Sequence, residues 1–162
     1  MHITGRLALV LALAAIAVAA LATTASASTQ PASGTFVEGP ETIIDERQSG
    51  GNLIIELTRA VVFSGTYTGA GQAYQRIVIH QDGSANVQMT ITFSGLACGQ
   101  PAELEFLIVG QVTFDENFMG DIAGTYTVID SGASDSRTLR GHGEFAGSAG
   151  IGGAYEGTAH CD

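Results

Sequence analysis

The feature that most constrains this 162-residue chain is a run of alternating apolar and polar residues between Gly110 and Phe145, broken by short turns. Within it, Ile122, Tyr126 and Val128 alternate with threonine residues, and the small and acidic residues at 131–136 reverse the chain. Period-two patterning with glycine-bearing turns is typical of antiparallel β-sheet. The segment therefore predicts consecutive β-strands.

The same pattern covers most of the chain after residue 52, and helical periodicity is nearly absent there. It is clearest over residues 85–95, which follow an Asp82-Gly83 pair that favours a hairpin turn because it tolerates positive φ. Seven or eight closely spaced strands predict an all-β barrel or sandwich. Glycine recurs inside the predicted strands, and glycine permits the sharp bending of a small closed barrel. We therefore favour the barrel.

The first 27 residues have the features of a cleavable signal peptide. Arg6 precedes an apolar run from Leu7 to Leu21, and Ala25-Ser26-Ala27 matches a cleavage signature. The alternative is a membrane anchor, but the run is shorter than the roughly 18 to 20 apolar residues that a spanning helix needs. We expect residues 1–27 to be removed and the protein to be secreted to the extracellular space.

The remaining chain predicts a single domain, residues 34–162. Residues 28–51 are expected to form a flexible leader that includes a short first strand at Gly34–Glu38, and residues 52–162 form the main part of the barrel. The polar stretch Glu41–Asn52 is expected to be the most mobile segment, because it lacks apolar alternation and contains Ser49-Gly50-Gly51.

The mature chain is strongly acidic. It keeps all 16 Asp and Glu residues but loses Arg6 from the 6 basic residues, so its net charge is about 5 − 16 = −11. A surface of this sign repels phosphate backbones and anionic lipids. We expect no nucleic-acid partner and no membrane partner after signal cleavage, and the acidity is sufficiently explained by solubility.

Two cysteines, Cys98 and Cys161, remain after export. In an oxidising compartment an even pair predicts one disulfide, with two unpaired thiols as the alternative. Four predicted strands separate them, so both would emerge at the same rim of an up-and-down barrel. The loop Leu96–Ala102 would then have to fold across the mouth as a tethered lid.

Five segments, in sequence order, carry a resemblance to a known family. They are Ser33-Gly34-Thr35-Phe36, Leu57-Thr58-Arg59-Ala60 leading to Phe63-Ser64-Gly65, Asp82-Gly83-Ser84-Ala85, Gly124-Thr125-Tyr126-Thr127-Val128, and Leu139-Arg140-Gly141-His142-Gly143-Glu144-Phe145. Together they resemble small bacterial barrels, common in actinobacteria, that are classified only as a domain of unknown function and are related in fold to allene oxide cyclase. The resemblance implies an eight-stranded antiparallel barrel with a central pocket. It implies no activity, and the export signal and the cysteine pair depart from the commonest members.

No arrangement of residues predicts catalysis or a cofactor. The chain has no G-x-S-x-G nucleophile motif, its histidines lack zinc-binding spacing, and Asp115, Glu116 and Asp121 fit no calcium-loop signature. Arg140, His142 and Glu144 would project from one face of a strand, and we expect that face to be the outer one because isolated charges are costly in a small core. The sequence does not indicate which face of the strands Tyr74–His80 and Arg140–Glu144 points inward. It also does not indicate whether the side chains of Glu56 and Arg76 point into the lumen or outward.

The apolar rows predict a lumen. Six residues are expected to line it and are the candidate ligand-binding residues: Met89, Ile91, Phe93, Phe106, Ile108 and Tyr126. The Tyr126 hydroxyl would be the main polar group, and no carboxylate or histidine falls in phase with the row. An eight-stranded barrel is either just filled by side chains or just able to hold a small ligand.

Three functions are consistent with this pattern. The first is a non-enzymatic protein that binds a small apolar molecule in the lumen. The second is a cyclase- or isomerase-like enzyme acting on a hydrophobic substrate, which is suggested by the fold analogy alone. The third is an interaction protein with a packed core and an acidic exterior. The sequence does not predict the oligomeric state.

Overall fold

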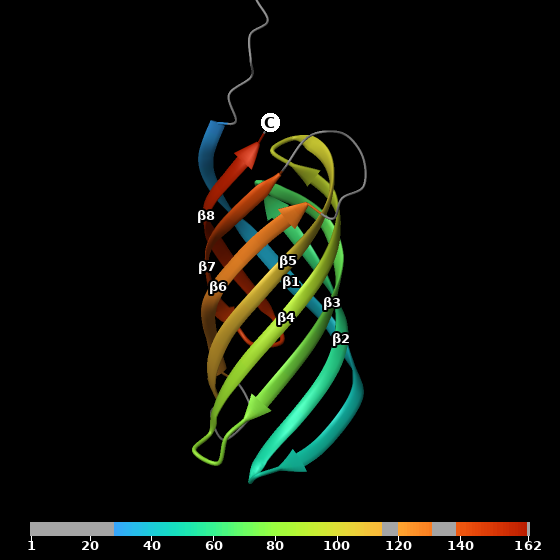
Figure 1. Cartoon of the computed structure of the whole chain (residues 1–162), viewed down its shortest axis with the longest axis vertical. Coiled ribbons are helices and arrows are strands. Elements are labelled where there is room, and N and C mark those ends of the chain that lie inside the picture. Colours follow the sequence, from blue (N-terminus) through green and yellow to red (C-terminus); the bar gives the residue numbers. More distant parts are fainter. Residues whose placement is uncertain (1–27, 115–119, 131–138, 162) are drawn as a thin grey trace, which may run out of the picture.

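The protein is a closed barrel of eight antiparallel strands, which confirms the predicted fold class (Figure 1). This computed structural model describes residues 28–114, 120–130 and 139–161. The strands are β1 (Ser28–Ser49), β2 (Asn52–Gly65), β3 (Tyr67–Ile79), β4 (Ser84–Ala97), β5 (Gln100–Phe114), β6 (Gly120–Asp130), β7 (Arg140–Ser148) and β8 (Gly152–Cys161). Each strand pairs with its neighbours in sequence, and β8 pairs with β1. The expected signal peptide lies outside the described residues.

The predicted alternation sets the two faces of the sheet. On β4, Val87, Met89, Ile91 and Phe93 are buried in the lumen, while the residues between them point outward and are partly or fully exposed. Because the side-chain period of a strand is two, this pattern fixes the register against β3 and β5 throughout the ladder. The buried side chains of all eight strands meet in one continuous hydrophobic core.

Tight turns join several neighbouring strands. Asp82-Gly83 turns β3 into β4 as predicted, with Gly83 at φ 81° and the Ser84 amide and hydroxyl both donating to the Asp82 carboxylate. Cys98 and Gly99 form the two-residue turn between β4 and β5, with φ values of 54° and 78°. A two-residue turn with both central φ angles positive suits the twist of a β-hairpin.

The first strand corrects two sequence predictions. Ser28–Ser33, expected in a flexible leader, pairs in β1 with the end of β8, and Glu41–Ser49, expected to be a mobile loop, pairs with Asn52–Arg59. The second pairing forms a long hairpin whose tip lies at the same end of the barrel as the β3–β4 turn (Figure 1). Most side chains of these segments are exposed, so their sequence shows no alternation of apolar and polar residues. They are strands because their backbones pair with β8 and β2, which the sequence pattern does not indicate. Gly39-Pro40 lies at a register shift and does not end the strand.

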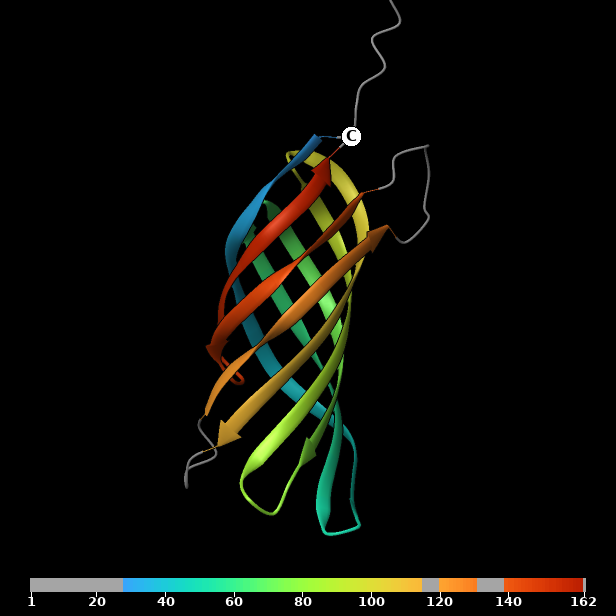
Figure 2. The same cartoon turned by 60° about the vertical axis from the view of Figure 1, so that its left-hand side comes forward.

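Two strand ends and one hairpin lie together at the same end of the barrel. Figure 2 shows the start of β1, the end of β8 and the β4–β5 hairpin at this end, and the β1–β2 hairpin at the opposite one. The disulfide between Cys98 and Cys161 joins the β4–β5 hairpin to the end of β8, so we call this end of the barrel the disulfide end. The end that contains the β1–β2 hairpin is called the far end. The lumen between them contains the candidate site.

Candidate functional site

Aromatic rings fill the part of the lumen nearer the disulfide end. Phe106 stacks on Phe63 with ring centroids 5.0 Å apart, and the ring of Tyr67 meets Phe106 edge-on at 5.1 Å. Phe93, one of the six predicted lumen residues, is fully buried and packs against both Phe63 and Phe106. These four rings come from the consecutive strands β2 to β5, so they fill the lumen from one half of the barrel wall.

An apolar cavity of about 30 Å³ remains in the middle of the lumen. The structure brings five of the predicted lumen residues to its wall: Met89, Ile91, Phe106, Ile108 and Tyr126. The other lining residues are Phe36, Glu38, Val61, Phe63, Phe145 and Tyr155. A cavity of this size has room for about two water molecules, whereas sites for drug-sized ligands measure several hundred Å³.

A buried ion pair lies at the edge of the cavity, which corrects the expectation that no carboxylate falls in phase with it. Nη1 of Arg59 donates to Oε2 of Glu38 at 2.6 Å, and both side chains are only 5% exposed. The Gly150 amide donates to the same Glu38 oxygen at 3.0 Å, and Nη2 of Arg59 donates to Glu41 at 3.1 Å. Glu38 therefore accepts hydrogen bonds from two donors on different parts of the barrel.

The inward position of Arg59 was the available signal for this pair. Arg59 lies in phase with Leu57 and Val61 on β2, so its side chain enters the lumen with theirs. A buried arginine requires an acidic partner, because an unpaired charge is costly in a core. Glu38 was missed as that partner because the expected first strand ended there.

Tyrosine hydroxyls supply most of the remaining polar groups. The Tyr155 hydroxyl accepts a hydrogen bond from the Tyr67 amide at 3.0 Å and donates to the Ser64 carbonyl at 3.2 Å. The hydroxyls of Tyr67 and Tyr126 are buried and have no partner within the described residues. Burial raises the pKa of Tyr126 to about 12, and also raises the pKa values of Tyr67 and Tyr155. Sequence reasoning identified only Tyr126.

Two further buried polar atoms have no partner within the described residues. They are Nε of Arg59, a donor, and Oε1 of Gln75, an acceptor. Gln75 is an inward residue of β3, while its neighbour Tyr74 points outward, which resolves the facing of that strand. Most buried polar groups in proteins are hydrogen-bonded to protein or to water.

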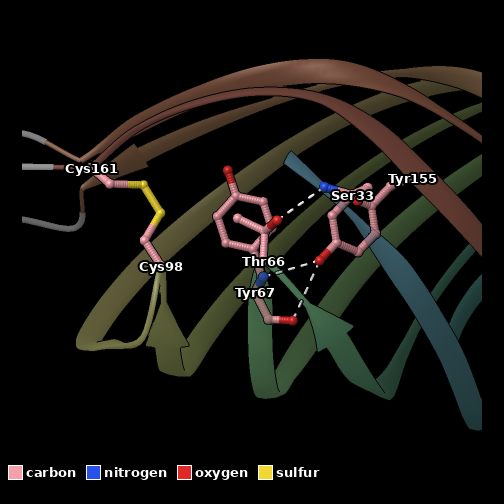
Figure 3. The surroundings of a disulfide bond; sticks show 6 residues. All are labelled: Ser33, Thr66, Tyr67, Cys98, Tyr155 and Cys161. Carbon is pink, nitrogen blue, oxygen red and sulfur yellow. Dashed lines mark hydrogen bonds between the residues drawn. A yellow bond between two sulfur atoms is a disulfide. The ribbon is translucent and has the colours of Figure 1, made fainter. Parts of the chain in front are cut away.

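The predicted disulfide closes the disulfide end (Figure 3). The Cα atoms of Cys98 and Cys161 are 6.2 Å apart. The segment expected to be a loop is instead the tip of the β4–β5 hairpin, which reaches the end of β8 across the mouth. The Cys98 amide also donates to the Thr66 carbonyl at 2.9 Å, so the tip is attached to the β2–β3 turn as well.

The charged row of β7 faces outward, as expected. Arg140, His142 and Glu144 are exposed, and His142 contacts the Thr158 hydroxyl at 3.4 Å. Glu56 and Arg76 also lie on the outer face, where Glu56 accepts hydrogen bonds from Tyr74 and Arg47. Of the predicted turn acids, Asp115 and Glu116 lie outside the described residues. Among those described, no three His, Cys, Asp or Glu side chains are placed to hold a metal ion.

The part of the chain that the structure describes contains no helix long and apolar enough to cross a membrane. No protein-family model matches the chain, and no curated protein shows significant similarity to it.

Proposed function

We propose that the protein is secreted and binds a small, mostly apolar molecule in the lumen of its barrel. The observation that carries this proposal is the cavity itself, whose wall is mostly hydrophobic and includes three residues with polar side-chain groups, Glu38, Tyr126 and Tyr155. Concave apolar sites with a few convergent polar groups are the usual form of small-molecule sites, and barrel lumens are common places for them.

The cavity limits the size of the ligand. At about 30 Å³ it has room for only about two non-hydrogen atoms, so a larger ligand requires neighbouring side chains to move. Met89 lies on the wall, and methionine is the residue that adapts most readily to a changed core volume. A narrow aliphatic chain fits this description better than a fused ring system does.

Secretion is supported by the signal-peptide pattern together with the disulfide, because disulfides persist mainly in oxidising compartments. We also propose a relationship to the allene oxide cyclase-like barrels. Its support is the order of the resembling segments along the chain and the eight-stranded closed ring.

Each alternative function has one supporting observation. A cyclase- or isomerase-like enzyme would need an acid or base at the cavity, and the Glu38 carboxylate lies there. An interaction protein would need only a solid core, and the stacked rings near Phe106 fill much of the lumen. Ligand binding is favoured over both because the lumen keeps an apolar cavity, and on its wall lies Tyr126, whose buried hydroxyl has no partner among the described residues.

Mass spectrometry of solvent extracts from the purified secreted protein tests the proposal, since a lumen ligand should co-purify. A matched pair of variants on β5 then locates it: Ile108→Phe narrows the cavity, whereas Leu107→Phe adds the same ring to the outer face. We expect the extracted molecule to be lost from Ile108→Phe and kept by Leu107→Phe. Equal retention by both variants would place the molecule outside the lumen, and the absence of any extract would favour the interaction protein.

A further inference from the structure

The second half of β1 has a backbone edge that no strand in the described part of the chain covers. β1 is 22 residues long, whereas β8, its neighbour on one side, has only 10 residues and pairs with β1 as far as Val37. The Glu38 amide still donates to the Ile151 carbonyl, in the β7–β8 turn, at 2.9 Å. Beyond that bond, residues 41–49 pair with β2 alone. One edge of this segment is therefore free to pair with another strand.

The turn at the tip of the β1–β2 hairpin indicates which backbone groups point to that edge. Gly50-Gly51 has φ values of 58° and 82°, as in a two-residue hairpin turn, so Ser49 and Asn52 flank it as a hydrogen-bonded pair. Hydrogen-bonded and non-hydrogen-bonded pairs alternate along an antiparallel ladder, so the N–H and C=O groups of Gln48 and Glu46 point away from β2. These groups are available to an added strand.

The free edge is exposed and partly apolar. Most side chains of residues 41–49 are exposed, and those of Ile43 and Ile44 are 54% and 57% exposed. Exposed edges with apolar side chains pair readily with other chains, and natural proteins protect them with charges, proline or bulges. Pro40 lies at a register shift before the segment, and a second shift follows Ile43. Residues 45–49 remain as a regular edge.

The charges of the segment decide which strand can pair with it. Residues 41–49 contain three acids and one base, so their net charge is 1 − 3 = −2. The single base, Arg47, is already bonded to Asp45 and Glu56. Glu46 has no ion-pair partner within the described residues. A second copy of this chain, with a net charge of −10, would place more acid against this edge, whereas a strand that carries lysine or arginine would neutralise it.

We propose that the free edge of β1 is a docking site for a basic, extended segment of another protein, which adds to the sheet as a strand beside residues 45–49. In strand addition, main-chain hydrogen bonds supply the affinity and alternate side chains supply the specificity. Glu46 pairs with Ile55, which is in phase with the inward Leu57, so Glu46 lies on the lumen face of the sheet. A lysine or arginine opposite Glu46 lies on the same face and forms a cross-strand ion pair. None of residues 41–49 lines the lumen cavity, so this site does not depend on a ligand there.

Amide hydrogen exchange tests strand addition directly. The probe is a seven-residue peptide of alternating lysine and valine, added to the full purified protein at 0.15 M salt, where attraction between distant charges is screened. We expect the Glu46 and Gln48 amides to exchange rapidly in the free protein and at least about tenfold more slowly with the peptide bound. The Arg47 amide, which faces β2, should be protected in both states. Unchanged exchange at Glu46 and Gln48 with saturating peptide would overturn the proposal.

Two pairs of variants separate backbone pairing from charge. Gln48→Pro removes the N–H group at the free edge and Gln48→Ala keeps it, and proline is tolerated in an edge strand where its nitrogen faces solvent. We expect Gln48→Pro to bind the peptide about tenfold more weakly than Gln48→Ala does. Glu46→Gln should lower the affinity about threefold, whereas Glu144→Gln, at an exposed acid on β7, should leave it unchanged.

Three results of these measurements would contradict the docking site. Equal binding by the two Gln48 variants would remove the role of the free backbone edge. Tighter binding of a peptide with glutamate in place of lysine would show that the edge does not select a basic partner. A dimer of the native protein that Gln48→Pro dissociates would assign the edge to a second copy of this chain.

Discussion

The side chain of Tyr67, on β3, crosses the lumen and places its hydroxyl against Gly141 on β7, the opposite wall of the barrel. A β-carbon added at Gly141 would overlap the tyrosine oxygen. The ring of Tyr67 is fully buried and contacts Phe106 and Tyr155. Glycine at position 141 is therefore required by the aromatic side chain that reaches it.

We predict that Gly141→Ala lowers the free energy of unfolding by about 1–3 kcal/mol, the usual cost of overpacking a filled core. Tyr67→Phe removes the overlapping oxygen, which has no partner within the described residues, so alone it should be close to neutral. The double variant should recover part of the loss, and a urea-denaturation double-mutant cycle measures the coupling. Recovery should be incomplete because the Thr158 carbonyl would remain 3.0 Å from the new β-carbon. Simple additivity would contradict the contact.

The sequence predicted the fold because its strongest signals are local. Alternation on β4 and the Asp82-Gly83 turn depend only on neighbouring residues, and both appear in the structure as expected. The disulfide was also predictable, because the signal-peptide pattern and the even cysteine count can both be read from the sequence alone. The way in which the chain reaches the second cysteine was not predictable. The β4–β5 ladder continues to the pair Ala97 and Gln100, so a two-residue turn crosses the mouth in place of the expected loop.

The buried ion pair of Glu38 and Arg59 was not predictable, because it depends on contacts between distant segments. Glu38 approaches Arg59 across a register shift in β1, and Gly150 reaches Glu38 from the β7–β8 turn. Alternation indicates which residues point inward, but it does not indicate which of them meet. Gln75 could have been found as an inward polar residue once the facing of β3 was known.

We predict that breaking the buried ion pair is far more costly than breaking an exposed one. Arg59→Met should lower the free energy of unfolding by about 3–5 kcal/mol, because it leaves the Glu38 carboxylate in a buried site with only the Gly150 amide as a donor. Arg47→Met is the matched control, since the Arg47 side chain is 45% exposed where it pairs with Glu56, and it should change stability little. Guanidinium denaturation monitored by circular dichroism measures both. Equal effects would contradict the buried environment of Glu38.

We predict that the disulfide contributes about 4 kcal/mol, the chain-entropy value for a sequence separation of 63 residues. Unfolding of Cys98→Ala/Cys161→Ala against the oxidised native protein measures it. Cys98 has φ 54°, a conformation that asparagine adopts more readily than alanine. Cys98→Asn/Cys161→Ala should therefore be about 1 kcal/mol more stable than the alanine pair. If the alanine pair were the more stable of the two variants, the turn would have to change its conformation once the disulfide is lost.

The buried tyrosines predict a loss of stability in alkali. Burial raises the pKa of Tyr126 to about 12, and it raises the pKa values of Tyr67 and Tyr155 as well, whereas the unfolded chain ionises near the ordinary value of 10.0. Below that value the tyrosines are neutral in both states and their contribution is fully present. As the pH rises from about 10 to 12, the unfolded state releases protons that the folded state keeps, so the free energy of unfolding should fall across this window.

Denaturation at stepped pH measures the fall, and tyrosinate absorbance should rise at a higher pH in the folded protein than in the urea-unfolded chain. In Tyr126→Phe the fall should be shallower, whereas a profile that stays flat to pH 12 in the native protein would contradict the burial of these hydroxyls.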